Sequence, residues 1–342
     1  MNVSASGSTT LTVRSWPLIA MIIAFALLPQ MAEGVFSGAI RQILTTAFLF
    51  GFVAFAWNIL SGYLGYLSLG EHLYFGLSAY LCAYLLSTFA ISPFIAVVPA
   101  ALLAAALAWS LARLVAGLRF RGTIFALVTL AVAEIGRVVI TRIPAFKGEA
   151  GIYLQLANDP VNFLFTNPMV YYYAALGLLA LGGVLGLGAY HSDWGLQLRA
   201  LRDEEVAARS LGVRIDLRLS QAAALSAAAF AVAGAFYSAS SFFVTPSTVL
   251  TIDIVVTVLI ICVVGGLGSV WGPLYGMLIV AAVQIALNKV GLSSTTAATW
   301  GHVIYGLIII VAVAVGAVLR QPDNALARRL KAAMSGKSAP AP

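Results

Sequence analysis

Long apolar runs fill most of the chain and are separated by short polar segments. A helix needs about 20 apolar residues to cross the hydrocarbon core of a bilayer. We predict ten transmembrane helices, over residues 16–31, 36–59, 72–90, 94–113, 122–142, 168–190, 220–243, 252–270, 273–289 and 301–319. The strands of a β-barrel would alternate apolar and polar positions, whereas these runs are continuous. The pattern therefore predicts an all-α polytopic membrane protein.

Composition agrees with this assignment. Of the 342 residues, 61% are hydrophobic and 9% are charged, whereas a soluble domain carries about 25% charged residues. The chain therefore has too little polar surface for a soluble globule, and we expect the lipid bilayer to surround it. A Ser/Thr-rich stretch over 1–15 is predicted to be disordered, a transmembrane domain to cover 16–319, and a basic tail to cover 320–342.

The positions of Lys and Arg predict the orientation. Net charge is +7, but the basic residues lie at the edges of apolar runs and form no patch that would favour nucleic acid. Cytoplasmic loops carry the excess of Lys and Arg, which predicts that both termini are cytoplasmic. The side then expected inside holds Arg14, Arg113, Arg119, Arg121, Arg199, Arg202, Arg209, Arg214, Arg218 and Arg320, and the outside keeps only Arg41, Arg142, Lys147 and Lys289.

Two glycine-rich segments, 61–70 and 265–273, interrupt the apolar pattern. Glycine permits close helix packing and sharp turns, which explains both segments without any function. At Gly265, Gly266 and Gly268 we expect close backbone approach or a positive φ. Interrupted helices that recur in the two halves of a transporter also mark binding sites, and both interpretations stay open. The residues that the second interpretation places on a translocation path are Gly65, Tyr66, Ser68, Gly70, Glu71, Glu134, Gly265, Gly266 and Gly268.

The loop over 191–219 contains a predicted amphipathic helix. Four residues form its expected apolar stripe, namely Leu198, Leu201, Ala208 and Leu211. Arg199 with Asp203, and Glu205 with Arg209, have the i,i+4 spacing of ion pairs, and Gly212 stands where a C-terminal cap is expected. Such a helix either docks into a groove of a soluble partner or lies on the membrane surface.

Four stretches resemble permeases of branched-chain amino acid ABC importers, of the LivM type. Residues 62–70 resemble the family's Gly-Tyr-x-Gly-x-x-Ser-Leu-Gly, and 121–130 look like its Arg-Gly-x-Tyr-Phe-Ala-x-x-Thr-Leu. Residues 264–273 match its Gly-Gly-x-Gly-x-x-x-Gly-Pro segment, and 199–213 resemble its cytoplasmic loop. The stretches occur in the family's order and spacing over about 35–290, and the stretch at 121–130 separates this type from the LivH type.

The resemblance implies an ABC importer permease fold in a bacterial inner membrane. The implied partners are a second, LivH-type permease, two cytoplasmic ATPases that bind ATP and Mg²⁺, and a periplasmic substrate-binding protein. The helix of the cytoplasmic loop would dock on an ATPase. The residues expected to couple are Arg199, Leu201, Arg202, Asp203, Glu204, Glu205, Ala207, Ala208 and Gly212.

Two departures from the family pattern bear on the substrate. Tyr66 stands where the family usually has Gln, and Glu71 stands where it usually has His. The segment 147–152 also has fewer glycines than usual and carries two charges. The substrate is therefore expected to be a branched-chain amino acid or a related small polar molecule, such as another amino acid, urea or an amide.

Ionisable groups within a span are functional candidates. Glu134 precedes Arg137 by one helical turn, so the two can neutralise each other, and Glu71 begins a span beside a glycine segment. No Gly-x-x-x-x-Gly-Lys-Ser/Thr motif and no metal-ligand or catalytic motif occurs in the sequence. We therefore expect a transport subunit that is not an enzyme and holds no metal or cofactor, with a stand-alone ion-coupled secondary transporter as the alternative.

Overall fold

The computed structural model describes residues 7–31, 37–118, 122–154, 159, 162–289, 300–301, 303–304 and 306–307. Residues 1–281 form one compact unit, and a second unit begins at residue 282. Of the second unit, the structure describes the end of one helix and the short helical stretches beyond residue 299. The packing and the sites described below are those of the first unit.

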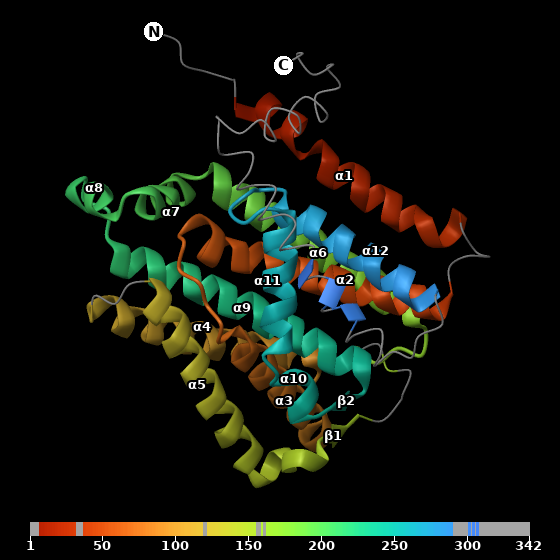
Figure 1. The fold of residues 1–342 in the computed structure, drawn as a ribbon. Coiled ribbons are helices and arrows are strands. Elements are labelled where there is room, and N and C mark those ends of the chain that lie inside the picture. The colour runs from red at the N-terminus through yellow and green to blue at the C-terminus, as the bar shows by residue number, and fades with distance from the viewer. Residues whose placement is uncertain are drawn as a thin grey trace. The chain divides into compact units, whose positions relative to one another are not determined.

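Helices account for nearly all of the described structure (Figure 1). In chain order they are α1 (Gly7–Met31), α2 (Gly38–Trp57), the π-helix η1 (Asn58–Tyr63), α3 (Glu71–Phe89), α4 (Pro93–Gly117), α5 (Gly122–Arg142), the short 3₁₀ turns η2 (Pro144–Phe146) and η3 (Gly148–Ala150), α6 (Pro168–His191), α7 (Asp193–Asp203), α8 (Glu205–Ser210), α9 (Ile215–Ser241), α10 (Pro246–Val249), α11 (Asp253–Gly265) and α12 (Gly272–Lys289). Two strands, β1 (Ile152–Tyr153) and β2 (Phe243–Val244), pair antiparallel.

The predicted helical membrane fold is confirmed, while the count of ten spans stays a prediction. Described helices lie at the positions of the first nine expected spans, and most of the tenth, 301–319, lies outside the described residues. Among the described residues, the helices that are long and apolar enough to cross a membrane are Gly38–Tyr63, Pro93–Gly117, Gly122–Arg142, Pro168–His191, Ile215–Ser241 and Pro246–Gly265.

The disorder predicted for 1–15 needs a correction. Helix α1 begins at Gly7, and residues 1–6 lie outside the described part of the chain. The helix passes through Pro17, and because the residue before a proline usually leaves the helical region, the apolar run from Leu18 does not by itself explain the turns before it. The basic tail over 320–342 also lies outside the described residues.

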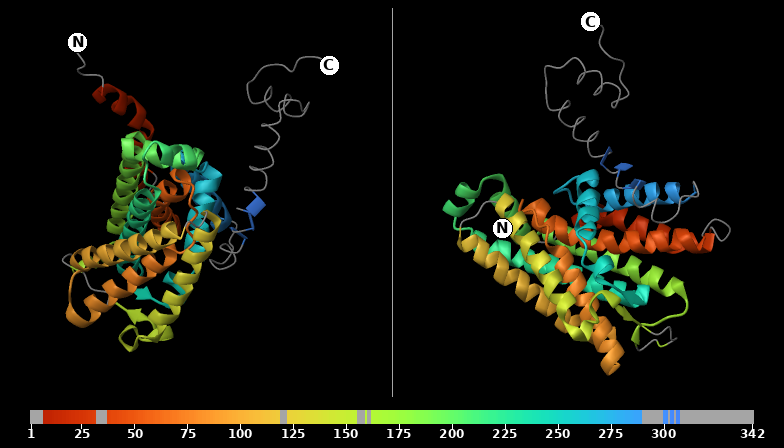
Figure 2. Two further views of the ribbon diagram at one scale, coloured as in Figure 1. Left: turned by 90° about the vertical axis from the view of Figure 1, so that its left-hand side faces the viewer. Right: turned by 60° about the horizontal axis from the view of Figure 1, so that its bottom comes forward.

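Helices α2 and α9 make the most extensive contacts in the first unit. Helix α2 packs against α6, and α9 packs against both α3 and α4 (Figure 2). One residue in four along α4 is a buried alanine, at Ala96, Ala100, Ala104, Ala108 and Ala112. Small side chains at this spacing let two helix backbones approach closely, which explains the long contact of α4 with the alanine-rich α9.

The opposite side of α4 is apolar and exposed. Leu102, Leu107 and Leu114 are among its exposed side chains. A soluble protein rarely leaves so many large apolar side chains in water, whereas lipid or another membrane subunit would cover them. This face of α4 therefore agrees with a membrane location.

The two strands join the segment after α5 to the end of α9. Ile152 pairs with Val244 and Tyr153 with Phe243, and the rings of Tyr153 and Phe243 stack with their centroids 4.0 Å apart. In the ribbon views this β1–β2 ribbon lies at one end of the helices and the α7–α8 pair at the other (Figure 1). The polar connections of the chain are thus gathered at two separate ends.

Candidate functional site

The first glycine segment breaks the regular helix at the end of α2. There the chain continues as the π-helix η1 and then as a non-helical segment to Gly70. Gly65 has φ +82°, which residues with a side chain rarely adopt. Two buried hydrogen bonds hold the segment, from Nε1 of Trp57 to the Ser68 carbonyl at 3.0 Å and from the Ser68 amide to Oγ of Ser61 at 3.3 Å. The break is therefore an ordered part of the core.

The second glycine segment is a tight turn between α11 and α12. Gly266 has φ +106° and Gly268 has φ +79°, so both positions require glycine. A Cβ at Gly265 would collide with the backbone of Gly272 and Gly276. The predicted need for positive φ or close approach at Gly265, Gly266 and Gly268 is thus confirmed.

Asn58 connects the two glycine segments. Its Oδ1 accepts a hydrogen bond from the Gly268 amide at 2.8 Å, and its Nδ2 donates to the Ser269 carbonyl at 2.9 Å. The Gly268 amide can only donate, which fixes the orientation of the Asn58 side chain. Asn58 is fully buried. Since a buried polar group left unpaired costs free energy, these two bonds stabilise the contact between the segments.

Arg202 of α7 reaches the same place. Its Nη1 donates to the carbonyl oxygen of Gly62 at 2.5 Å. Its stem lies beside Gly65, where an added Cβ would be 3.1 Å from Cγ of Arg202. We call the cluster of Asn58, Gly62, Arg202, Gly268 and Ser269 the break junction. It joins α7 to both glycine segments, although its members come from three distant parts of the sequence.

The predicted amphipathic helix of the 191–219 loop is in fact two helices. Helix α7 ends at Asp203, Glu204 adopts φ −152° and ψ 95°, and α8 begins at Glu205. The extended Glu204 turns the chain, so α7 and α8 have separate axes (Figure 1). The helical periodicity continues across this residue, which explains why the break could not be seen in the pattern.

The predicted apolar stripe divides into a buried part and an exposed part. Leu198, Leu201 and Ala208 are buried inside this chain, whereas Leu211 is 85% exposed. The stripe therefore packs α7 against α6, η1 and α9, with α8 against α7, and offers no continuous surface to a partner. Two further apolar side chains project outward, Val206 at 72% and Leu196 at 59% exposure.

Most of the predicted surface charges form local contacts. The pair of Glu205 and Arg209 is confirmed, with Oε1 2.8 Å from Nη2. Arg199 instead places its guanidinium 3.8 Å from the centre of the Tyr190 ring, a cation–π contact. Asp203 and Ala207 are exposed at the end of α7 and in α8.

Gly212 caps α8 as predicted. It has φ +88°, and its amide donates to the Arg209 carbonyl at 2.9 Å. The next amide, of Val213, donates to the Ala208 carbonyl at 3.1 Å. These two bonds form a Schellman motif, which ends a helix with a left-handed residue. The turn orients the chain from α8 into α9.

Tyr66 contacts α8. Its hydroxyl lies 3.5 Å from Oε2 of Glu205, and its ring packs edge-on against Phe125. Tyr66, Glu205 and Arg209 line a cavity of about 700 Å³ together with Gly65 and Arg202. We call it the junction cavity because it opens beside the break junction.

Gly70 and the residue before it pack against the middle of α5. The Leu69 amide donates to Oγ1 of Thr129 at 3.1 Å. A Cβ at Gly70 would collide with the Thr129 carbonyl. The first glycine segment therefore packs against α5 as well as against α7 and the turn after α11.

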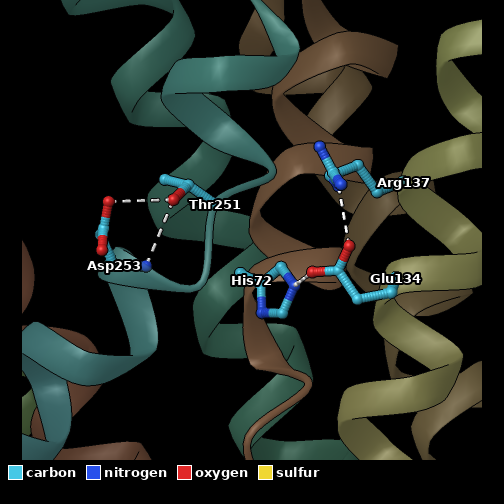
Figure 3. Close-up of polar contacts among 5 residues, drawn as sticks. All are labelled: His72, Glu134, Arg137, Thr251 and Asp253. Carbon is cyan, nitrogen blue, oxygen red and sulfur yellow. Dashed lines mark hydrogen bonds and ion pairs between the residues drawn. The ribbon is translucent and has the colours of Figure 1, made fainter.

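Glu71 and His72 begin α3 and are buried (Figure 3 shows His72). Ser68 and Ser226 lie near the Glu71 carboxyl group, yet Oε2 of Glu71 has no hydrogen-bond partner among the described residues. Nε2 of His72 lies 3.7 Å from Oε1 of Glu134. Glu134 also accepts a bond from Nε of Arg137 at 2.9 Å, so the predicted Glu134–Arg137 pair is confirmed.

The structure thus brings some of the residues expected on the translocation path next to the residues expected to couple to an ATPase. Gly65, Tyr66 and Gly268 contact residues of α7 or α8, whereas Glu71 and Glu134 lie apart from these helices, beside α9 and on α5. Sequence reasoning missed Asn58 and Thr129. The only signal for Asn58 was its place as an amide side chain in an apolar run.

Comparison with known proteins gives one match. The model of a family described as branched-chain amino acid transport system / permease component matches residues 39–313. Searches of curated proteins and of solved structures found no match. The matched range contains both glycine segments, α7 and α8.

Proposed function

Because the chain belongs to the branched-chain amino acid transport permease family, we propose that it is a membrane-spanning subunit of an ABC importer. In this proposal it lies in a bacterial inner membrane beside a second, LivH-type permease. A periplasmic binding protein delivers a branched-chain amino acid or a related small polar substrate, and two ATPases supply the energy. ATP and Mg²⁺ bind to those ATPases, and this chain alternates access to a site within the membrane.

The arrangement of the polar segments supports the proposed orientation. Both glycine segments and the 191–219 loop are expected on the cytoplasmic side, and in the structure all three meet at the break junction. The 143–167 loop is expected outside, and its strand β1 pairs with β2 at the other end of α9. A common end for these segments is what the ten-span topology requires, and the excess of Lys and Arg assigns that end to the cytoplasm.

The contact of Arg202 with Gly62 is the observation that carries the coupling part of the proposal. An ATPase bound at the exposed side chains of α8 would displace α8 and, through Glu204, α7. Arg202 would transmit this displacement to the Gly62 carbonyl at 2.5 Å, and Asn58 would transmit it to the turn after α11. Packed side chains of this kind carry coupling between distant sites.

Substitutions on the exposed side of α8 test the docking. Val206→Asp and Leu211→Asp should release the ATPases, because each places a charge where an apolar contact is proposed. Leu201→Asp would not test docking, because Leu201 is buried inside this chain and a charge there would disturb the fold itself. The matched control is Tyr153→Asp, which places the same charge on an apolar side chain 70% exposed at the opposite end.

The measurement is co-purification of the ATPases with the detergent-extracted permease. We expect binding to fall about tenfold or more for Val206→Asp, as for a lost interface anchor, and to stay at the wild-type level for Tyr153→Asp. Equal ATPase recovery with Val206→Asp, Leu211→Asp and the wild type would exclude docking on α8.

A proline that disrupts α7 gives a second test, and the structure shows where the proline must be placed. Ala207 lies in the first turn of α8, where proline is tolerated. Ala200 lies inside α7 and is exposed, so Ala200→Pro should break α7 at a cost of about 3 kcal/mol. Transport should then fall much further with Ala200→Pro than with Ala207→Pro, and equal transport by the two variants would contradict the role of α7.

The alternative of an ion-coupled secondary transporter has one observation in its favour. Glu71 is buried, and Oε2 has no hydrogen-bond partner among the described residues, as expected for a carboxylate that binds a cation in the membrane. The two functions differ in their energy source. Uptake by vesicles that contain this chain alone and are driven by an ion gradient would favour the alternative, whereas uptake that needs ATP and the ATPases favours the importer.

A further inference from the structure

The side of α5 that faces away from α3 carries a charged pair. Leu127, Glu134 and Val138 share this side, because intervals of seven and four residues return to the same face of a helix. Leu127 and Val138 are exposed, and the side chains of Glu134 and Arg137 are each nearly half exposed. We call Leu127, Glu134, Ile135, Arg137 and Val138 the α5 face.

The charged pair lies well inside the span that α5 forms. Helix α5 is long and apolar enough to cross a membrane. At a rise of about 1.5 Å per residue, Glu134 is about 18 Å from Gly122 and about 12 Å from Arg142, the two ends of the helix. Nε of Arg137 donates back to Glu134 at 2.9 Å (Figure 3), so the guanidinium does not reach for the outer surface. Charged side chains at such depth almost always face protein or a water-filled cavity.

The exposed side of α4 provides a contrast. Leu102, Leu107 and Leu114 are exposed there, and the charged residue of α4 is Arg113, in the last five residues of the helix. In α2, α6, α9 and α11, too, every Asp, Glu, Lys and Arg lies within five residues of an end. Lipid is therefore a suitable neighbour for the exposed side of α4, whereas the α5 face needs a polar neighbour.

A second membrane protein can supply that neighbour. The bilayer core holds no water of its own, so even a hydrated Glu134 would need a protein wall opposite α5. Membrane helices associate through close packing and interhelical hydrogen bonds, and the α5 face offers apolar side chains for the first and a carboxylate and a guanidinium for the second. The expected span over 301–319 of this chain has no Asp, Glu, Lys or Arg with which to pair them.

We propose that the second permease of the importer packs against the α5 face and places polar side chains opposite Glu134 and Arg137. This inference rests on the proposed importer function, and it names the surface of this chain that meets the membrane partner. The exposed side of α4 then faces lipid.

Photo-crosslinking in native membranes tests the contact in the complete transporter. The photo-reactive amino acid p-benzoylphenylalanine replaces Ile135, which is 64% exposed beside Glu134. Irradiation should join position 135 to an epitope-tagged second permease. The matched control carries the same amino acid in place of Leu102 of α4, which is 66% exposed, and should give no such product.

Removal of the charged pair distinguishes a protein neighbour from lipid. The double variant Glu134→Leu with Arg137→Leu makes the α5 face apolar. At an interface this change removes interhelical hydrogen bonds, so recovery of the second permease with this chain in detergent should fall about fivefold or more. If lipid covered the face, recovery would stay at the wild-type level or rise. Leu102→Ala with Leu107→Ala is the control on α4 and should leave recovery unchanged.

The outcomes separate this inference from the importer proposal. Crosslinks from position 135 alone, with loss of the second permease in the double leucine variant, support the α5 face as the interface. Crosslinks from position 102 instead, from both positions equally, or from position 135 only to lipid or to this same chain would overturn it and leave the importer intact. Unchanged recovery of the double leucine variant would also overturn it. A wild-type chain that co-purifies with neither a second permease nor an ATPase would contradict the proposed function itself.

Discussion

The two glycine segments look alike in the sequence but differ in the folded chain. The first, after α2, is buried throughout η1 and continues as an extended segment held by Ser61 and Ser68. The second, after α11, is a partly exposed turn in which Gly266 and Gly268 have positive φ. Hydrogen bonds and packing therefore stabilise the first segment. The second segment depends on the backbone conformation of its glycines and on the close approach of α11 to α12.

The difference shows that two similar glycine-rich segments can have different structural roles. The first segment has polar contacts to α5 and α7, and Asn58 just before it bonds to the turn after α11, so a change in it would reach several elements. In the second segment Gly268 and Ser269 contact Asn58, while Gly265 fits between helix backbones. We call the second segment the support of the break junction, because its shape depends on backbone contacts between α11 and α12.

The largest loss of stability should come from a substitution in the second glycine segment. Gly265→Ala would place a Cβ against the backbone of Gly272 and Gly276, where no flexible side chain can yield. We expect a loss of about 3 kcal/mol, the upper range for overpacking, measured by thermal unfolding of the detergent-purified complex. The control is Gly188→Ala in α6, where an added Cβ meets nothing within 4 Å, and it should be neutral or slightly stabilising.

Loss of the link between the segments should have an intermediate effect. Asn58→Leu leaves the Gly268 amide and the Ser269 carbonyl without their partner, at an expected cost of about 1–3 kcal/mol. Thr257→Val removes an exposed hydroxyl from α11 and should change stability by less than about 0.5 kcal/mol. Equal melting temperatures for the two variants would show that the Asn58 link contributes nothing.

The smallest effect should come from a change of conformation alone. Gly266→Ala meets only Cβ of Ser269, at 3.7 Å, so its cost is the strain of φ +106°, about 1–2 kcal/mol. The same measurement ranks it against Gly265→Ala. A Gly266→Ala variant that melts below Gly265→Ala would mean that strain, and not close approach, dominates the second segment.

The helices could be predicted from the sequence, because apolar runs of membrane length determine where they form. Local features were predicted too, including the Gly212 cap, the Glu134–Arg137 pair and the conformations of Gly266 and Gly268. Each depends on residues a few positions apart. The family resemblance was confirmed for the same reason, since its motifs are short and local.

The break junction could not be predicted, because its contacts are long-range. Asn58 and Gly268 are 210 positions apart, and Gly62 and Arg202 are 140 apart. The prediction that the apolar stripe of this loop faces a partner or the membrane surface was wrong for a related reason. Periodicity shows that Leu198 and Leu201 share a face, but it does not tell whether this chain or a partner covers that face.

The central claim is that α7 transmits ATPase motion to the first glycine segment through Arg202. Its most direct test is the number of leucine molecules imported per ATP hydrolysed by the reconstituted transporter with Arg202→Gln. Arg202 is exposed, so we expect the variant to fold and to bind ATPases. We predict continued ATP hydrolysis with leucine import reduced about tenfold or more, since a charged hydrogen bond to Gly62 is lost. A wild-type ratio of import to hydrolysis in Arg202→Gln would contradict the account.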